Sequence, residues 1–192
     1  MDVLAANEYG RLAQGVGGRS KGKNYIFFVA KKAIPQDKFR DITYSKFVCD
    51  VRPQKAEPNS TRLTVGGNRI NYPDNYGTPT DMLLVKLLLN SIISTKRAKF
   101  MAAAINKTFT LITPLTWYEY VQLRLADIPD EIIEEYKLKD IATAEGFVYV
   151  DIRKGMYGFS QAGLVAQQLL EKRLQKHEYE QSKIIPCFWT HK

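Results

Sequence analysis

Short runs of β-branched and aromatic residues, each bounded by turn-forming residues, predict five strands. The second and third runs flank the turn-rich segment QKAEPNS, so we expect them to pair as an antiparallel hairpin. Residues 1–23, in contrast, are polar and glycine-rich without a helical or strand period, which predicts a flexible basic arm. The predicted strands span residues 25–29, 43–51, 61–65, 118–123 and 147–152.

Apolar residues spaced three or four positions apart predict three helices in the remainder of the chain. The helices cover about residues 80–95, 129–138 and 160–177, whereas 99–105 (KFMAAAI) fits either a helix or a strand. Hairpin strands mixed with helices, without a regular alternation of the two, indicate an α+β fold. We expect an antiparallel sheet with packed helices.

The composition indicates a basic protein. The chain of 192 residues has 28 lysines and arginines against 20 aspartates and glutamates, a formal net charge of +8. A basic surface of this kind favours polyanionic partners, nucleic acid above all. Two cysteines are too few for a disulfide scaffold and favour a reducing compartment.

Membrane and export signals are not evident in the sequence. The first residues have neither a basic nor an apolar signal region, and the longest apolar stretch, 82–93, is interrupted by Lys86 and Asn90. We therefore expect an intracellular protein of the cytoplasm or nucleus, neither secreted nor bound to a membrane.

Residues 17–24 (GGRSKGKN) nearly match the phosphate-binding loop GxxxxGK[ST]. Asn24 stands where that loop needs a hydroxyl to ligate magnesium, and the apolar run that follows predicts a strand instead of a helix. A flexible basic loop is the favoured interpretation. The two histidines, His177 and His191, lack metal-ligand spacing, and we interpret them as solvated side chains.

Basic residues gather on the predicted hairpin and the loop after it. Guanidinium groups there can hold a phosphate with two hydrogen bonds, and nearby aromatic side chains can stack on bases. A solvated charged face is the competing interpretation. This candidate nucleic-acid surface comprises Arg52, Lys55, Arg62 and Arg69, with Tyr44 and Phe47 nearby.

Residues 154–163 (KGMYGFSQAG) join a predicted strand to a predicted helix. The glycines permit a tight turn or the close approach of another segment. The helix start presents free backbone N–H groups, and Gln161 offers both a donor and an acceptor. Together with Lys154, Tyr157 and Gly158, this pattern predicts a turn that contacts an anion or a nucleotide.

This stretch, with the helix LLEKRLQKHEYEQS and the segment IIPCFWTHK after it, resembles the reverse transcriptase of copia-like LTR retrotransposons. FVCDVRPQKAEPNSTRLTVGGNRI resembles the fingers of that polymerase, and KFMAAAINKTFTLITPLTWYEYVQL resembles the palm strand of its first catalytic aspartate with the element that follows. The resemblance runs from about residue 7 to the C-terminus. It implies a fingers-like β segment at 24–79 and a palm-like α+β segment at 80–192, truncated before the second aspartate motif.

The family is an RNA-directed DNA polymerase that works on an RNA template and a DNA primer. Its carboxylates hold two Mg²⁺ ions, one activating the primer 3′-hydroxyl and one steadying the triphosphate. The resemblance implies that Arg62 touches the incoming triphosphate and that Gln161 lies under the nucleotide and template. It also implies that Phe109 screens the sugar 2′ position.

Two departures from the family pattern predict a degenerate, catalytically inactive chain. Alanine occupies the first aspartate position, at Ala104 or, with a slip of one residue, at Ala103, and alanine offers no oxygen to a hard cation. The paired aspartates of the family would follow Lys192. We therefore expect no catalytic residue and no Mg²⁺ at a catalytic site. The alternatives are a non-catalytic nucleic-acid-binding remnant and a nucleotide hydrolase that uses residues 17–23.

Overall fold

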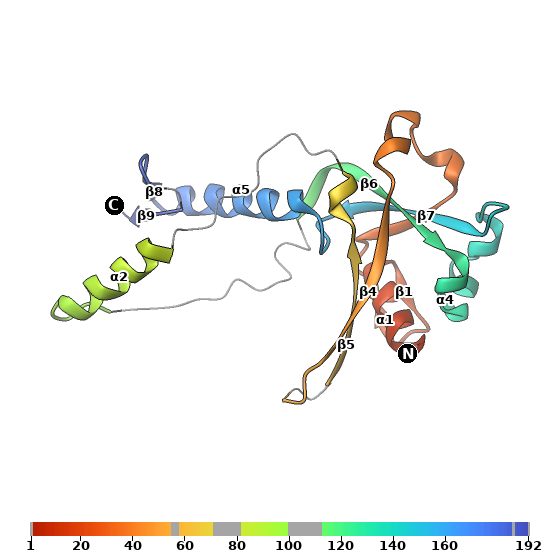
Figure 1. Ribbon diagram of the computed structural model, residues 1–192, viewed down its shortest axis with the longest axis horizontal. Helices are drawn as coiled ribbons and strands as arrows, with labels where there is room; N and C mark the ends of the chain where they lie inside the picture. Colours follow the sequence, from red (N-terminus) through yellow and green to blue (C-terminus); the bar gives the residue numbers. More distant parts are fainter. Residues whose placement is uncertain (1, 55–57, 71–81, 100–112, 186, 192) are drawn as a thin grey trace.

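The computed structural model describes residues 2–54, 58–70, 82–99, 113–185 and 187–191. Helices and strands alternate irregularly along the chain, as Figure 1 shows. The helices are α1 (Asp2–Leu12), α2 (Met82–Ser94), α4 (Asp130–Glu135) and α5 (Ser160–Lys176). The strands are β1 (Gly15–Val16), β2 (Ser20–Lys21), β3 (Ile26–Val29), β4 (Thr43–Val51), β5 (Asn59–Val65), β6 (Pro114–Arg124), β7 (Phe147–Lys154), β8 (Tyr179–Gln181) and β9 (Trp189–His191).

Five strands form the central sheet in the order β3-β7-β6-β4-β5. All neighbours in it are antiparallel except β4 and β6, which pair in parallel through Thr43↔Val121 and Tyr44↔Gln122. The prediction of an α+β fold is confirmed, whereas the expectation of an antiparallel sheet is wrong at this pair. A long connection separates β4 from β6, and a long connection lets two neighbouring strands run in the same direction.

The predicted hairpin is confirmed. β4 and β5 pair antiparallel from Ser45↔Val65 to Val51↔Asn59. Beyond its short contact with β6 the hairpin leaves the body of the molecule and projects as a two-stranded arm (Figure 1). The predicted strands at 25–29, 118–123 and 147–152 are confirmed as β3, β6 and β7.

The N-terminal segment is not the flexible arm that the sequence predicted. Residues 2–12 form α1, and Ala6, Tyr9 and Leu12 are at most 2% exposed. The Tyr9 ring meets the Phe47 ring edge-on, with centroids 5.3 Å apart. Spacing of three residues brings these apolar side chains onto one helical face, and burial of that face against β4 and β5 outweighs the glycine-rich composition.

The core lies between one face of the sheet and helices α1 and α4. Alternate residues of β6 and β7, such as Val121 and Leu123 or Val148 and Val150, point toward it, whereas β3 is a short continuous apolar run. Helical residues of α1 and α4 complete the cluster, so both helices are integral parts of the fold. Its most buried members include Leu12, Ile26, Val121, Ile132, Val148 and Ile152.

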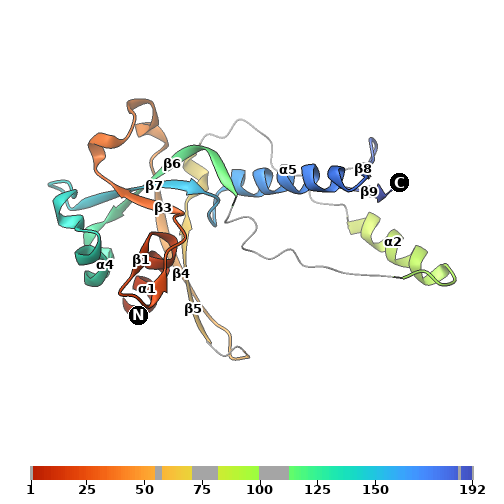
Figure 2. The same cartoon turned by 180° about the vertical axis from the view of Figure 1, so that it is seen from behind.

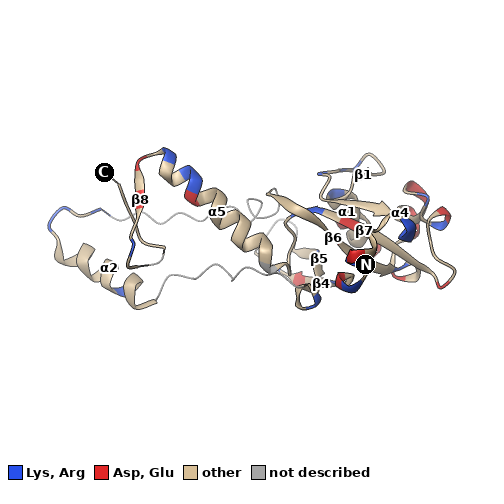
Figure 3. Ribbon diagram, turned by 90° about the horizontal axis from the view of Figure 1, so that it is seen from above, with Lys and Arg blue, Asp and Glu red and all other residues tan. Residues whose placement is uncertain are grey.

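Helices α2 and α5 confirm the predicted helical segments, and α4 confirms the short acidic helix. α5 leads away from the sheet and carries β8 and β9 at its far end (Figures 1 and 2). The expectation of packed helices is wrong for α2, which has no buried residue among those described, with Met82 65% and Ile93 85% exposed. In Figure 3 the ribbon of α2 is coloured almost entirely as uncharged residues. No helix among the described residues has the length and apolar character to span a membrane.

Candidate nucleic-acid interface

The turn at 155–159 docks onto the end of β5. The Val65 N–H donates a hydrogen bond of 2.8 Å to the Tyr157 carbonyl oxygen. Gly158 has a φ of +98°, and a Cβ at this position would overlap the Val65 carbonyl oxygen. A Cβ at Gly67 would likewise overlap the Gly158 carbonyl oxygen. Two glycine-containing segments that are far apart in sequence therefore interlock through their backbones.

This docking brings a cation from the hairpin over an aromatic ring of the turn. The Arg62 guanidinium lies 5.5 Å from the centroid of the Tyr157 ring. Both side chains are half-buried. The arrangement unites two residues that the sequence analysis assigned to separate motifs.

A second cation and a second ring lie beside this pair. The Lys154 Nζ is 5.1 Å from the centroid of the Tyr25 ring and donates a hydrogen bond of 2.9 Å to the Lys23 carbonyl oxygen. Burial raises the pKa of the Tyr25 phenol, positive Arg11 opposes that shift, and Tyr157 adds to it. Tyr25 therefore lies within electrostatic reach of both Arg11 and Tyr157.

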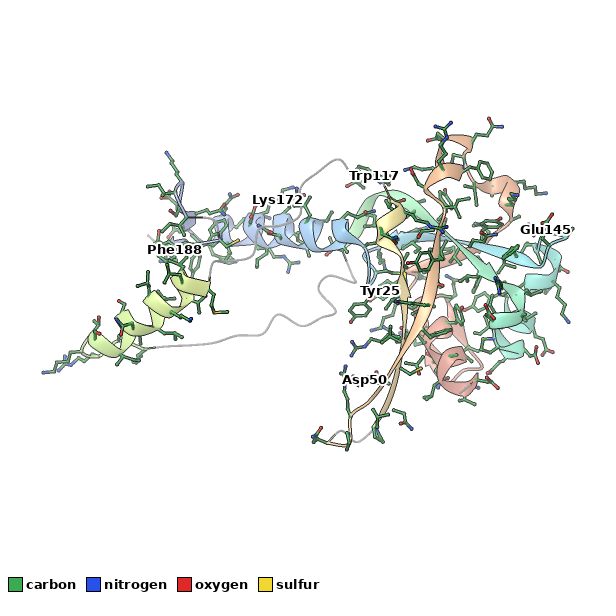
Figure 4. All side chains as sticks on the ribbon, in the orientation of Figure 1. Tyr25, Asp50, Trp117, Glu145, Lys172 and Phe188 are labelled. Carbon is green, nitrogen blue, oxygen red and sulfur yellow. The ribbon has the colours of Figure 1, made fainter. Side chains whose placement is uncertain are left out.

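We call Arg11, Tyr25, Arg62, Lys154 and Tyr157 the basic–aromatic cluster. It brings together α1, the residue just before β3, β5, the end of β7 and the turn after it. Glu8 forms an ion pair of 2.8 Å with Arg11 of this cluster, and Asp50 lies within electrostatic reach of Arg62. The buried Tyr25 hydroxyl has no hydrogen-bond partner among the described residues. Figure 4 labels Tyr25, at the level where the hairpin leaves the body of the molecule.

Arg69 forms a similar pair with Tyr44 of β4. Its guanidinium lies 5.4 Å from the centroid of the Tyr44 ring, and the Tyr44 hydroxyl lies 3.4 Å from Asn68 Oδ1. Arg69 and Tyr44 also line a cavity of about 570 Å³ between β4 and β6. Arg69 is exposed and is available to a phosphate.

Gln161 is buried, and its amide is used inside the protein. Its Nε2 donates a hydrogen bond of 2.9 Å to Glu119 Oε1, which also accepts a hydrogen bond of 2.8 Å from Trp117 Nε1. Burial raises the pKa of the Glu119 carboxyl, and the bonds from Gln161 and Trp117 oppose that shift. The structure thus places Gln161 as an anchor of the first turn of α5. Its contact with a nucleotide stays a prediction.

The remaining basic candidates are spread along the hairpin. Arg52 lies just beyond β4 and forms an ion pair of 2.6 Å with Asp50, which lowers the pKa of that carboxyl. Lys55 and Phe109 lie outside the described residues, as do the alanines at the expected aspartate position, Ala103 and Ala104. The structure therefore neither joins them to the basic–aromatic cluster nor separates them from it.

The described residues offer no group of three histidine, cysteine, aspartate or glutamate side chains that could hold a metal ion. Asp151 is buried on β7, and its carboxylate accepts hydrogen bonds of 3.0 to 3.3 Å from Arg153. Arg153 is itself 3.9 Å from the centroid of the Phe27 ring. Asp151 is therefore occupied by a protein cation and is a poor ligand for Mg²⁺.

The segment that resembles a phosphate-binding loop folds as a small hairpin. β1 and β2 pair antiparallel, with Gly17 and Gly18 at positive φ in the turn between them. Arg19 donates a hydrogen bond of 2.7 Å to Glu131 Oε1 and so ties this turn to α4. Because no helix follows, the backbone does not form the strand–loop–helix arrangement that a phosphate-binding loop requires.

Sequence reasoning missed Arg11 and Tyr25 as members of the candidate interface. The signal for Arg11 was the helical spacing of Ala6, Tyr9 and Leu12, which was hidden by flanking glycines. Tyr25 was assigned to a strand, and nothing local in the sequence indicates that its ring meets Lys154. That contact depends on the pairing of β3 with β7.

Comparison of the chain with models of protein families, with curated proteins and with solved structures finds no match.

Proposed function

We propose that the chain is a fingers and partial palm segment related to the reverse transcriptase of copia-like LTR retrotransposons. In this proposal the chain binds nucleic acid but does not transfer nucleotides. The observation that carries the proposal is the basic–aromatic cluster at the docked turn, where Arg62 and Lys154 lie over tyrosine rings. The collinear motifs of the sequence support the ancestry, and the mixed α+β fold is compatible with it.

The cluster suits a phosphate backbone with unpaired or frayed bases. Arg62 presents a planar fork of donors that can hold a phosphate, and Lys154 adds a second positive charge. Tyr157 offers a ring on which a base can stack. Arg69, beside Tyr44, would extend the same contact along the ligand. The RNA template and DNA primer of the family are the ligands that the resemblance suggests, which implies an intracellular protein.

The two Mg²⁺ ions of the family do not fit the described residues. A two-metal centre needs carboxylates that converge on one point. Asp151 is paired with Arg153, and Glu119 is held by Gln161 and Trp117. The proposal therefore gives the chain no metal-dependent step. Contact of Arg62 and Gln161 with an incoming nucleotide remains part of the resemblance.

The binding half of the proposal is tested by fluorescence anisotropy with a labelled RNA–DNA hybrid at low salt. We expect Arg62→Gln and Lys154→Gln each to weaken binding by about tenfold, the loss expected for one charge-assisted contact. Lys139→Gln is the matched control, because Lys139 is exposed on the short helical turn Leu138–Asp140 after α4. Equal affinities for the three variants and the wild type would refute the assignment of the interface.

The proposed lack of nucleotide transfer is tested by primer extension with Mg²⁺ and all four deoxynucleoside triphosphates. We expect no incorporation above that of a chain-free control. Robust incorporation that depends on Mg²⁺ would refute the proposed lack of nucleotide transfer and leave the binding result intact.

A further inference from the structure

One edge of β4 is open along most of its length. The Gly66 N–H donates to the Tyr44 carbonyl oxygen at 2.9 Å, and the Arg52 N–H donates to the Pro58 carbonyl oxygen at 2.6 Å. Backbone groups alternate in an antiparallel pair, so the even-numbered residues of β4 bond to β5. The backbone groups of residues 45, 47, 49 and 51 then point away from β5. Pairing with β6 ends at Tyr44↔Gln122, so this edge has no strand partner within the described ranges.

The opposite edge of the same hairpin is closed by the protein itself. The Leu63 N–H donates to Glu8 Oε1 at 3.3 Å, and the Val65 N–H donates to the Tyr157 carbonyl oxygen at 2.8 Å. A carboxylate of α1 and the docked turn thus cover the outer edge of β5. Unprotected strand edges pair readily with other strands, and here the protection is limited to one side.

The sequence along the open edge of β4 is complementary to itself. Residues 46–50 read Lys-Phe-Val-Cys-Asp, with opposite charges placed symmetrically about Val48. If a second copy of β4 lies antiparallel with Val48 at the centre, Lys46 of each copy faces Asp50 of the other. Opposite charges directly across an antiparallel pair stabilise it.

The backbone allows this register. Phe47 would face Cys49 of the second copy, and both residues direct their backbone groups outward, so they form hydrogen-bonded pairs. Val48 would face Val48 as a non-hydrogen-bonded pair, where side chains approach most closely. A register shifted by one residue would place outward groups against inward ones and lose every hydrogen bond.

The edge is accessible. Val48 is 43% and Val51 67% exposed, and Figure 4 shows Asp50 toward the tip of the projecting hairpin. The cavity of about 570 Å³ between β4 and β6 adjoins Ser45 and Lys46. In the register centred on Val48, Val51 of the second copy faces Ser45, next to this cavity.

We propose that two copies of this chain associate through antiparallel pairing of their β4 strands, with Val48 on the two-fold axis and two ion pairs between Lys46 and Asp50. The pairing joins the two hairpins into one continuous sheet of four strands. It does not depend on the basic–aromatic cluster, which borders the other edge of the hairpin, whereas Arg69 and Tyr44 line the cavity next to Ser45.

Sedimentation velocity of the full chain over a concentration series measures the association. We expect a monomer–dimer equilibrium that Lys46→Glu weakens at least tenfold, because it replaces two attractions with two repulsions. The double variant Lys46→Glu/Asp50→Lys restores the charge pairing and should recover most of the dimer. Val48→Lys places two positive charges next to each other at the two-fold axis and should abolish the dimer. Circular dichroism melting confirms that each variant folds.

Cysteine chemistry provides a second readout in a Cys187→Ser background. Cys49 residues of the two copies would lie diagonally, about 7–8 Å apart, within reach of a short bismaleimide. We expect a cross-linked dimer that Val48→Lys prevents. A monomer at every concentration would overturn the proposal. Association that persists in Val48→Lys would also overturn it, because it would indicate contact through another surface such as α2.

Discussion

Gly158→Ala tests whether the turn at 155–159 is docked on β5 as the structure has it. The φ of +98° costs a residue with a side chain about 1–3 kcal/mol. The new Cβ would also collide with the Val65 carbonyl oxygen, and relief of that collision would break the Val65–Tyr157 hydrogen bond, worth about 1 kcal/mol. We therefore expect a loss of about 2–4 kcal/mol in the free energy of unfolding.

Gly163→Ala is the matched control for this prediction. Gly163 lies in α5, and a Cβ there would meet no atom within 4 Å. The same chemical change should stabilise the protein by up to about 1 kcal/mol, the helix propensity difference between glycine and alanine. Urea denaturation followed by circular dichroism measures both variants. Equal effects of the two substitutions, or no loss for Gly158→Ala, would refute the docking.

Two further substitutions test the core and a buried carboxyl. Leu12→Ala should cost about 2–5 kcal/mol in the free energy of unfolding, because α1 is part of the core, whereas exposed Val3→Ala should change it by less than about 0.5 kcal/mol. If both substitutions have equal, small effects in urea denaturation, α1 is not part of the core and the expectation of a flexible N-terminal arm is correct. Burial raises the pKa of the Glu119 carboxyl, so the folded state holds this proton more tightly than the unfolded chain does, and the contribution of Glu119 to wild-type stability falls as the pH rises above the ordinary glutamate value of about 4.5. Glu119→Gln should remove that fall, so its stability relative to wild type should increase from pH 4 toward neutrality; parallel pH curves would contradict this.

Most strands and helices follow from local sequence patterns. The apolar runs of β3 and β7, the alternation in β6 and the helical spacing in α5 identify those elements correctly. The parallel pairing of β4 with β6 could not be predicted, because register between distant strands depends on contacts that no local pattern records. α1 was missed because its stability comes from burial of Tyr9 and Leu12 and not from helix propensity.

The candidate interface was predicted in parts but not as a unit. Arg62, Lys154 and Tyr157 were identified from charge and motif, yet their proximity depends on the backbone interlock at Gly67 and Gly158. The burial of Gln161 was not foreseen, because its partner Glu119 is 42 residues away in sequence. Side-chain chemistry is readable from a sequence, whereas the pairing of distant groups follows only from the packed fold.

Binding of the chain to an RNA–DNA hybrid, measured over a range of salt concentrations, shows whether the basic–aromatic cluster contacts phosphates. Each phosphate contact releases counterions, so the logarithm of the association constant falls linearly with the logarithm of salt concentration. We expect a steep slope for the wild type and a slope smaller in magnitude by about 2 for the double variant Arg62→Gln/Lys154→Gln, because two phosphate contacts are lost. Equal slopes for the two proteins, or no binding by the wild type at low salt, would contradict it.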